Sequence, residues 1–421
     1  MRRYLCYAGL LASLGIFAFI ETLLNRAAGA DAAKPAAPAT GDLTVGEPIH
    51  YANLTIFPLA SRTPRTENRF TTLDEGLKAG TVKVMEIDAQ GAAVANAAGA
   101  DPFGGQGSRG ADVNHLALVN HSKKPLYLMP GEIIVGGQQD RTIAQEYVIP
   151  PGDKPVTIAV FCVEHGRWVG RGAAELRGIV AANADATISA TNSFSPVAQG
   201  AGTVELKVDQ SQFIGSVGNV SKAARLAVQA DKNQGKVWDK VAESNMKNRV
   251  ESESGDFAGN YLDRKSVERL EPYFKSLDKQ VADSANIVGV AVAINGKMDT
   301  LDIFESTPLF RQLWPKLLKS YALDAATAAE GETHQTSKSK PAKKTEKTAS
   351  VDDARKFLTE AMSGRPEKSD KNGDIAITTL STDHTLTFSA KDASRAEIGG
   401  ASPAAGLGGY GGAIHTFGGS K

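Results

Sequence analysis

Apolar and polar residues alternate in short runs through the middle of the chain. The runs cover residues 113–120, 126–129, 132–135, 143–149 and 156–164. Glycine and proline separate them, as at Pro130-Gly131 and Gly136-Gly137. Short strands separated by glycine and proline are typical of an antiparallel sheet in a sandwich or a barrel-like core.

The second half of the chain changes to a helical period. Residues 222–246 and 266–281 carry apolar side chains at helical spacing among charges, which predicts two or three amphipathic helices. Apolar runs at 287–294 and 298–304 flank Asn295-Gly296, a dipeptide that predicts a hairpin because both turn residues need a positive φ. Another helix is predicted over 307–321. The fold class is therefore α+β: an antiparallel β-rich core, sandwich or barrel-like, with a layer of amphipathic helices.

Composition divides the chain into six segments. We expect, in order, a signal peptide or anchor (1–30), an Ala/Pro tether (31–42), a main β-rich domain (43–328), a Lys-rich disordered insert (329–350), a helix plus hairpin that completes the main domain (351–391), and a mobile Gly-rich tail (392–421).

The first segment predicts export. Arg2-Arg3, an apolar run over residues 5–20 and Ala28-Gly29-Ala30 follow the order of a cleavable signal peptide, which indicates a periplasmic or secreted protein. The apolar run is shorter than the roughly 20 helical residues that span a bilayer. If the leader is not cut, however, it could extend through residue 24 and anchor the protein in a membrane.

Charge and residue counts exclude several classes of function. Lys+Arg 47 balance Asp+Glu 47, so no global field favours nucleic acid as a partner. The seven histidines have no metal-ligand spacing, and loss of the leader would leave Cys162 as the one cysteine, so no metal site is expected. No P-loop, G-x-S-x-G or kinase signature is present, and the cofactor, if there is one, stays unknown. Residues 105–110 (GQGSRG) match the dinucleotide pattern G-x-G-x-x-G by letters alone, and we interpret them as a loop because no strand precedes them and no helix follows.

The side chains that could bind a ligand or take part in a reaction are most concentrated between residues 130 and 168. A two-residue period places Cys162 and Glu164 on one face of a strand and His165 on the other. We predict a polar pocket for a small anionic ligand, in which Arg141 and Arg167 provide paired N–H donors. The remaining ligand-binding candidates are Gln139, Asp140 and His165, with Glu132 and Glu164 as orienting carboxylates.

Three other interpretations of the same residues remain open. Glu164 and an arginine could form a structural ion pair beside a buried, inert thiol. A hydrolase-type enzyme could use Cys162 as nucleophile, or Glu132 and Glu164 as an acid–base pair. The chain could also be a structural or partner-binding envelope protein, and whether it is an enzyme is undecided.

Three segments carry a family resemblance. Residues 130–132 (PGE), 136–141 (GGQQDR) and 161–168 (FCVEHGRW) resemble the ARG and Rhodanese-Phosphatase-superfamily-associated Protein domain. The resemblance covers about residues 43–328 and resumes at the C-terminal hairpin. It implies at most a link to ADP-ribose or NAD-derived metabolites, through the ADP-ribosylglycohydrolases and rhodanese-phosphatase proteins after which the family is named.

Overall fold

The computed structural model describes residues 42–88, 93–94, 111–167, 194–197, 205–208, 213–336, 348–372, 375–392 and 413–419. The predicted leader and nearly all of the predicted tether lie outside these residues. No helix of the described part is long and apolar enough to cross a membrane.

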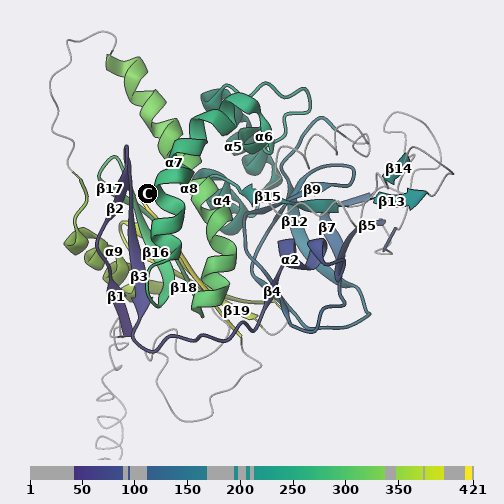
Figure 1. Cartoon of the computed structure of the whole chain (residues 1–421), viewed down its shortest axis with the longest axis horizontal. Coiled ribbons are helices and arrows are strands. Elements are labelled where there is room, and N and C mark those ends of the chain that lie inside the picture. Colours follow the sequence, from purple (N-terminus) through teal and green to yellow (C-terminus); the bar gives the residue numbers. More distant parts are fainter. Residues whose placement is uncertain are drawn as a thin grey trace, which may run out of the picture.

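A nine-stranded antiparallel sheet forms one side of the molecule (Figure 1). Its order is β1-β3-β16-β17-β21-β20-β19-β18, and β2 pairs with β3. The strands are β1 (Leu43–Val45), β2 (Ile49–Tyr51), β3 (Leu54–Ser61), β16 (Ile287–Ile294), β17 (Lys297–Phe304), β18 (Arg365–Asn372), β19 (Ile375–Ser381), β20 (Thr385–Asp392) and β21 (Ala413–Gly418).

The predicted hairpin at the centre of this sheet is confirmed. Strands β16 and β17 pair from Gly289 to Ile294 and turn at Asn295 and Gly296, whose φ angles are 50° and 70°. Positive φ at both positions is what this tight turn requires. The turn thereby sets the register that brings Asp302 of β17 opposite Val290.

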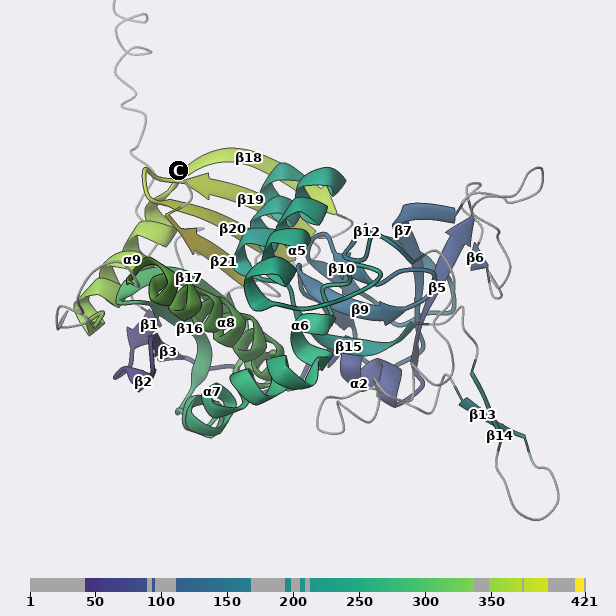
Figure 2. The ribbon, with the colours of Figure 1, turned by 90° about the horizontal axis from the view of Figure 1, so that it is seen from above.

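A seven-stranded sheet curls around a second core (Figure 2). Its order is β15-β9-β10-β12-β7-β5-β6. The strands are β5 (Val82–Asp88), β6 (Ala93–Val94), β7 (Ala111–Asn120), β9 (Glu132–Gly136), β10 (Arg141–Ile143), β12 (Val156–Cys162) and β15 (Phe213–Asn219). Two small sheets accompany it, made of β4 (Thr71–Thr72), β8 (Leu126–Leu128) and β11 (Tyr147–Ile149), and of β13 (Phe194–Val197) and β14 (Glu205–Val208).

One short helix packs on this curled sheet. The spacing of Thr72 and Glu75 in the sequence predicts a capping box, and helix α2 (Leu73–Lys78) begins with one: each of the two side chains bonds the other residue's main-chain N–H group. Its apolar residues Leu73 and Leu77 join the core of the curled sheet. The cap therefore fixes where the chain leaves β4 and starts to cover the sheet.

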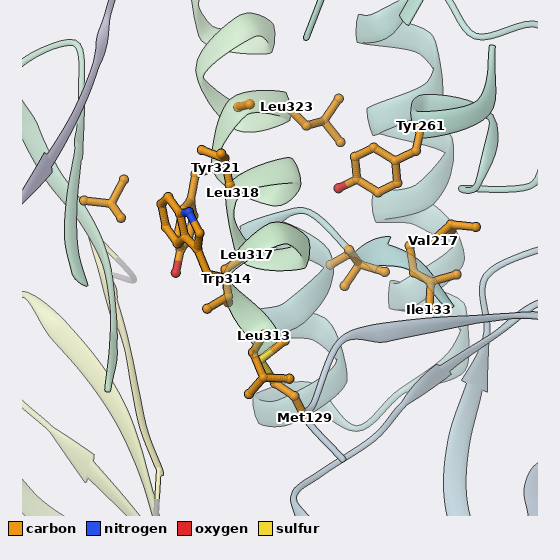
Figure 3. Packing of buried hydrophobic residues seen from close by; sticks show 14 of the residues in the cluster. Met129, Ile133, Val217, Tyr261, Leu313, Trp314, Leu317, Leu318, Tyr321 and Leu323 are labelled. Atoms are coloured by element: carbon orange, nitrogen blue, oxygen red, sulfur yellow. The ribbon is translucent and has the colours of Figure 1, made fainter. Parts of the chain in front are cut away.

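A layer of helices separates the two large sheets (Figures 1 and 2). It consists of α4 (Lys222–Leu226), a π-helical turn (Ala227–Asp231), α5 (Gln234–Asn248), α6 (Gly259–Leu262), α7 (Arg264–Ala282) and α8 (Thr307–Thr336). Apolar side chains of α8 face both ways, with Trp314 and Tyr321 toward the nine-stranded sheet and Val217 and Ile133 of the curled sheet on the other side (Figure 3). The shared core explains why apolar residues cover more than one side of α8.

The predicted α+β class is confirmed: both large sheets are antiparallel and helices cover them. Helix α9 (Val351–Ser363) covers the other face of the nine-stranded sheet, where Phe357 and Leu358 meet Phe57 and Leu59 of β3. The nine-stranded sheet is thus buried on both faces over its central strands.

Two expectations about the ends of segments are wrong. Part of the predicted mobile tail is β21, which lies between β17 and β20 and is buried along its whole length. Part of the predicted disordered insert is helical, because α8 continues to Thr336. Glycine and lysine content dominated both predictions, whereas pairing with two neighbouring strands decides the state of β21.

Candidate functional site

Arg141 and Cys162 are register partners on β10 and β12, and Ile134 of β9 is the second partner of Arg141. Directly opposite residues of a sheet share a face, and the next residues on that face, Ile143 and Val160, belong to the core of the curled sheet. The side chains of Arg141 and Cys162 therefore point into the curled sheet, where both are fully buried.

Glu86 of β5 provides the opposite charge within this interior. Its Oε2 atom lies 3.7 Å from Nη2 of Arg141, and Arg141 Nη1 donates to Gln139 Oε1 at 3.4 Å. Among the described residues, Glu86 Oε2 and the Nε and Nη2 atoms of Arg141 have no hydrogen-bond partner. Glu86 and Arg141 therefore form a buried ion pair that is too long for a hydrogen bond.

Arg167 follows β12 and bonds several groups near the end of that strand. Its Nε and Nη2 atoms donate to the two carboxylate oxygens of Glu164 at 2.8 and 2.7 Å, and Nη2 also lies 3.2 Å from Asp140 Oδ1. Nη1 donates to the carbonyl oxygen of Gly137 at 2.7 Å. Paired guanidinium–carboxylate bonds of this kind are strong and directional, so Arg167 holds the loop between β9 and β10 against the end of β12.

The loop between β9 and β10, which Arg167 binds, is tightly packed against its neighbours. Gly137 has a φ of 54°, and a Cβ atom there would lie 2.5 Å from Glu86 Oε1 and 2.6 Å from the Phe213 ring. Glu164 Oε2 accepts from the Asp140 main-chain N–H at 2.9 Å. A glycine is therefore required at position 137 by its left-handed backbone and by close packing over Glu86.

The Cys162 thiol lies beside Arg141 but is not activated. Burial raises the pKa of Cys162, and attraction to Arg141 offsets this only in part. The main-chain N–H and C=O of Cys162 bond to the side chain of Gln234, at 2.8 and 2.9 Å, which joins β12 to the start of α5. A thiol that stays protonated at neutral pH is a weak nucleophile.

The side chains of Glu132 and His165 lie apart from this cluster, although the His165 main-chain carbonyl oxygen accepts from Gln139 Nε2 at 3.4 Å. The carboxylate of Glu132 accepts from Lys316 Nζ, which also lies 2.5 Å from Asp74. Burial raises the pKa of Glu132, and Lys316 opposes the shift. His165 is exposed and packs edge-on against Trp238, with ring centroids 4.5 Å apart.

Of the eight predicted site residues, the structure therefore brings six together and leaves Glu132 and His165 elsewhere. The six are Gln139, Asp140, Arg141, Cys162, Glu164 and Arg167. With Glu86, three carboxylates face the two guanidinium groups, so an anion at the arginines would compete with carboxylates already bound there.

Sequence reasoning missed a second cluster, which joins the nine-stranded sheet to the loop after β10. Arg225 bonds both carboxylate oxygens of Asp302, at 3.1 and 2.9 Å, and Asp302 also accepts from Tyr321 and pairs with His415 Nδ1. The other imidazole nitrogen, Nε2, lies 2.7 Å from Glu146 Oε1.

Every member of this cluster is buried, including Tyr127, whose hydroxyl donates to Glu146 Oε1 at 2.7 Å. Burial alone would lower the pKa of His415, but the carboxylates of Glu146 and Asp302 outweigh it and raise that pKa to about 9. Burial would raise the pKa of Asp302, but Arg225 and then His415 hold it well below its usual range. Positive and negative charges thus alternate from Arg225 to Glu146.

No local sequence motif predicts this cluster. Its members come from six separate elements or loops, and His415 and Glu146 are 269 residues apart. The one available signal was the apolar Ile414 and Phe417 around His415, which is compatible with a short strand.

A cavity of about 220 Å³ borders Glu146. Strands β18, β19 and β20, the loop after β10 and the π-helical turn form its walls. Its polar lining includes Glu146, Gln229, Lys232, Lys368, Asp370 and Thr379, and its apolar lining includes Ile377, Leu386 and Phe388. Among the described residues, no group of three or more His, Cys, Asp or Glu side chains is placed to hold a metal ion.

Arg167 should contribute strongly to stability. Replacing it in Arg167→Leu leaves the buried carboxylates of Glu164 and Asp140 without their cation, which should cost about 3–5 kcal/mol of unfolding free energy in urea titrations. Arg264→Leu, which removes an arginine from an exposed ion pair with Glu268, is the matched control and should change nothing measurable. Equal effects of the two variants would contradict the assigned role.

His415 should make stability depend on pH. Its pKa in the folded protein, about 9, lies above its ordinary value of 6.5, so its contribution to stability is complete below pH 6.5 and is lost as pH rises through about 9. The difference in unfolding free energy between the native chain and His415→Gln should shrink by on the order of 3 kcal/mol between pH 6 and pH 10. A difference independent of pH would show that His415 is neutral when folded.

The three segments that carry the family resemblance, residues 130–132, 136–141 and 161–168, lie within the region that a family model matches. The family model described as the ARG and Rhodanese-Phosphatase-superfamily-associated Protein domain matches residues 42–395. No curated protein and no solved structure matches the chain. The match spans most of the chain, including both large sheets and the helical layer, and so the chain belongs to the ARG and Rhodanese-Phosphatase-superfamily-associated Protein domain family.

Proposed function

We propose that the protein binds a small polar molecule in the cavity beside Glu146. The observation that carries the proposal is the cavity itself, a hollow of about 220 Å³ in which polar residues such as Glu146 and Lys232 lie beside the apolar Ile377 and Phe388. A concave site that combines apolar side chains with a few polar groups is the usual form of a small-molecule site.

The backbone around Gln229 supports the same site. Residues Ala227–Asp231 form a π-helical turn between α4 and α5, and such turns are frequent at functional sites. The turn ends at Lys232, whose φ of 50° is left-handed. This unusual geometry places Gln229, Ala230 and Lys232 along one wall of the cavity.

The size of the cavity limits the ligand. A hollow of about 220 Å³ has room for a molecule of the size of an amino acid or a monosaccharide. If the family's link to ADP-ribose holds for this chain, the cavity would hold at least part of such a molecule.

Glu146 is prepared to contact a ligand before one arrives. Tyr127 and His415 both donate to its Oε1 atom, so the carboxylate is oriented from behind by buried groups. Orientation by existing contacts lowers the entropy that binding would otherwise cost. At Arg141 and Arg167, by contrast, protein carboxylates already occupy the position of an anion, which is why we place the ligand here.

Filling the cavity should abolish binding. In Thr379→Trp the indole would occupy the hollow from β19, and we expect loss of ligand-induced stabilisation in a thermal screen against amino acids, sugars, nucleosides and nucleotides. The native chain should be stabilised by at least one class, by about 2.7 kcal/mol at a ligand concentration of 100 Kd.

Thr378→Trp is the matched control, because consecutive residues of a strand point to opposite faces. It should keep the binding of the native chain. Binding that survives in Thr379→Trp, or a native chain that no compound in the screen stabilises, would contradict the proposal.

We further propose that the protein is exported, on the basis of the leader-like residues 1–30. Cell fractionation of the expressed full chain should find it outside the cytoplasm, with a mature N-terminus near residue 31. A chain that stays cytoplasmic with Met1 intact would exclude export, and a membrane-bound chain with its leader retained would identify the leader as an anchor.

A further inference from the structure

We infer that strand β18 is a movable wall of the cavity and that the ion pair between Lys232 and Asp370 holds this wall closed. Movement of the wall would control how a ligand enters and leaves, so its role in function rests on the proposed ligand site. The movement itself can be measured without knowing the ligand.

The main chain of β18 is held along one edge. It is the last strand of the nine-stranded sheet and, among the described strands, pairs only with β19. The register of this pairing shifts between Pro366 and Lys368, and such an irregularity weakens the ladder locally. Strands β19 and β20, which line the same side of the cavity, each pair with two neighbours. The ladder therefore fixes β18 less firmly than the two strands beside it.

Burial of side chains adds little to the attachment of β18. Residues 365–369 and Lys371 are exposed, and Asp370 is partly buried. No described side chain of β18 belongs to a hydrophobic core. By contrast, Phe388 of β20, which also lines the cavity, is buried and packs against Phe417 of β21. Because few buried apolar contacts mark the parts of a protein that open most easily, β18 is the part of this sheet that we expect to move.

One ion pair joins β18 to the other side of the cavity. Asp370 Oδ2 lies 3.1 Å from Nζ of Lys232, the residue that ends the π-helical turn, and 2.9 Å from Nζ of Lys368 on β18 itself. All three residues line the cavity. Among the described side chains, no other hydrogen bond or ion pair connects β18 to another element. Beyond the ladder to β19, the position of β18 therefore depends on this ion pair.

The ion pair lies on the solvent side of the cavity. The side chains of Lys232 and Asp370 are 47% and 38% exposed, whereas that of Glu146, which lines the same cavity, is 3% exposed. An ion pair between exposed side chains contributes little to stability, and salt screens it. A wall held in this way opens at low cost, and it opens more readily at high ionic strength.

The Lys232 end of the ion pair is fixed. The main-chain N–H of Lys232 donates to the carbonyl oxygen of Ala227 at 3.0 Å, and Ala227 and Val228 are buried in the core between the two large sheets. Since the π-helical turn is anchored in this core and β18 is not, breaking the ion pair releases β18 rather than the turn.

A cysteine placed in the cavity can report the movement. Thr379 of β19 lines the cavity, and Thr379→Cys is a small change. We would measure its rate of alkylation by N-ethylmaleimide, an uncharged reagent, in the folded full-length protein. Peptide mass spectrometry separates its signal from those of the natural Cys6 and Cys162. Adding Asp370→Asn, which removes the charge that holds Lys232, should raise this rate about two- to fivefold.

Ionic strength gives a second measurement of the same movement. A rise from about 0.05 M to about 1 M NaCl should accelerate alkylation of the Thr379→Cys protein and should have no effect once Asp370→Asn is present. Lys236→Ala is the matched control, because it breaks another exposed ion pair, with Asp231, beside the same turn but outside the cavity lining. It should leave the rate unchanged.

The outcomes separate this inference from the proposed function. If Asp370→Asn and salt both leave the alkylation rate unchanged, or if Lys236→Ala raises it equally, the movable wall is overturned and the cavity remains a ligand site. If alkylation responds as expected but the metabolite screen yields no ligand, the movable wall is supported and the proposed function is overturned.

Discussion

The alternating ion chain Arg225–Asp302–His415–Glu146 is the interaction on which the arrangement of the molecule depends. Asp302 and His415 belong to neighbouring strands of the nine-stranded sheet, Arg225 belongs to the helical layer, and Glu146 lies in a loop next to the curled sheet. Each charge would be costly to bury alone, and each is compensated by a neighbour of opposite sign. Moving any one layer away from the others would expose an uncompensated charge in the interior.

The same chain of charges explains why the end of the sequence matters to the centre of the structure. Strand β21 reaches its place between β17 and β20 only after the rest of the sheet has been synthesised, and it carries His415. Until β21 pairs, Asp302 and Glu146 lack the cation that joins them. Strand pairing and charge compensation are therefore completed in one step, which favours a single arrangement of the sheet over alternatives with the strand absent.

Local sequence patterns predicted the parts of the fold that depend on interactions between residues close in the sequence. The Asn295-Gly296 turn, the capping box at Thr72 and the helical period before residue 282 depend on neighbours within a few positions. The convergence of Arg141, Cys162 and Glu164 was also accessible, because β10 and β12 are close in sequence and pair directly.

The second cluster could not be predicted in this way. Asp302 is 77 residues from Arg225 and 113 from His415, and no period or spacing relates positions that meet through strand order and helix packing. The glycine-rich context of β21 further concealed His415, since composition there favours a tail. A single sequence contains the residues of such a cluster but not the topology that assembles them.

The two clusters also show why residue type is a poor guide to a binding site. The stretch around Arg141 holds acids, amides, a thiol and arginines, yet Arg167 and Glu164 use their strongest groups on each other and on the adjoining loop. The cavity beside Glu146 has fewer reactive side chains, but it is a hollow lined by both polar and apolar residues. Space that a ligand can enter is a stronger indication of a binding site than a concentration of reactive side chains, because charged groups that are already paired have little bonding capacity left for a ligand.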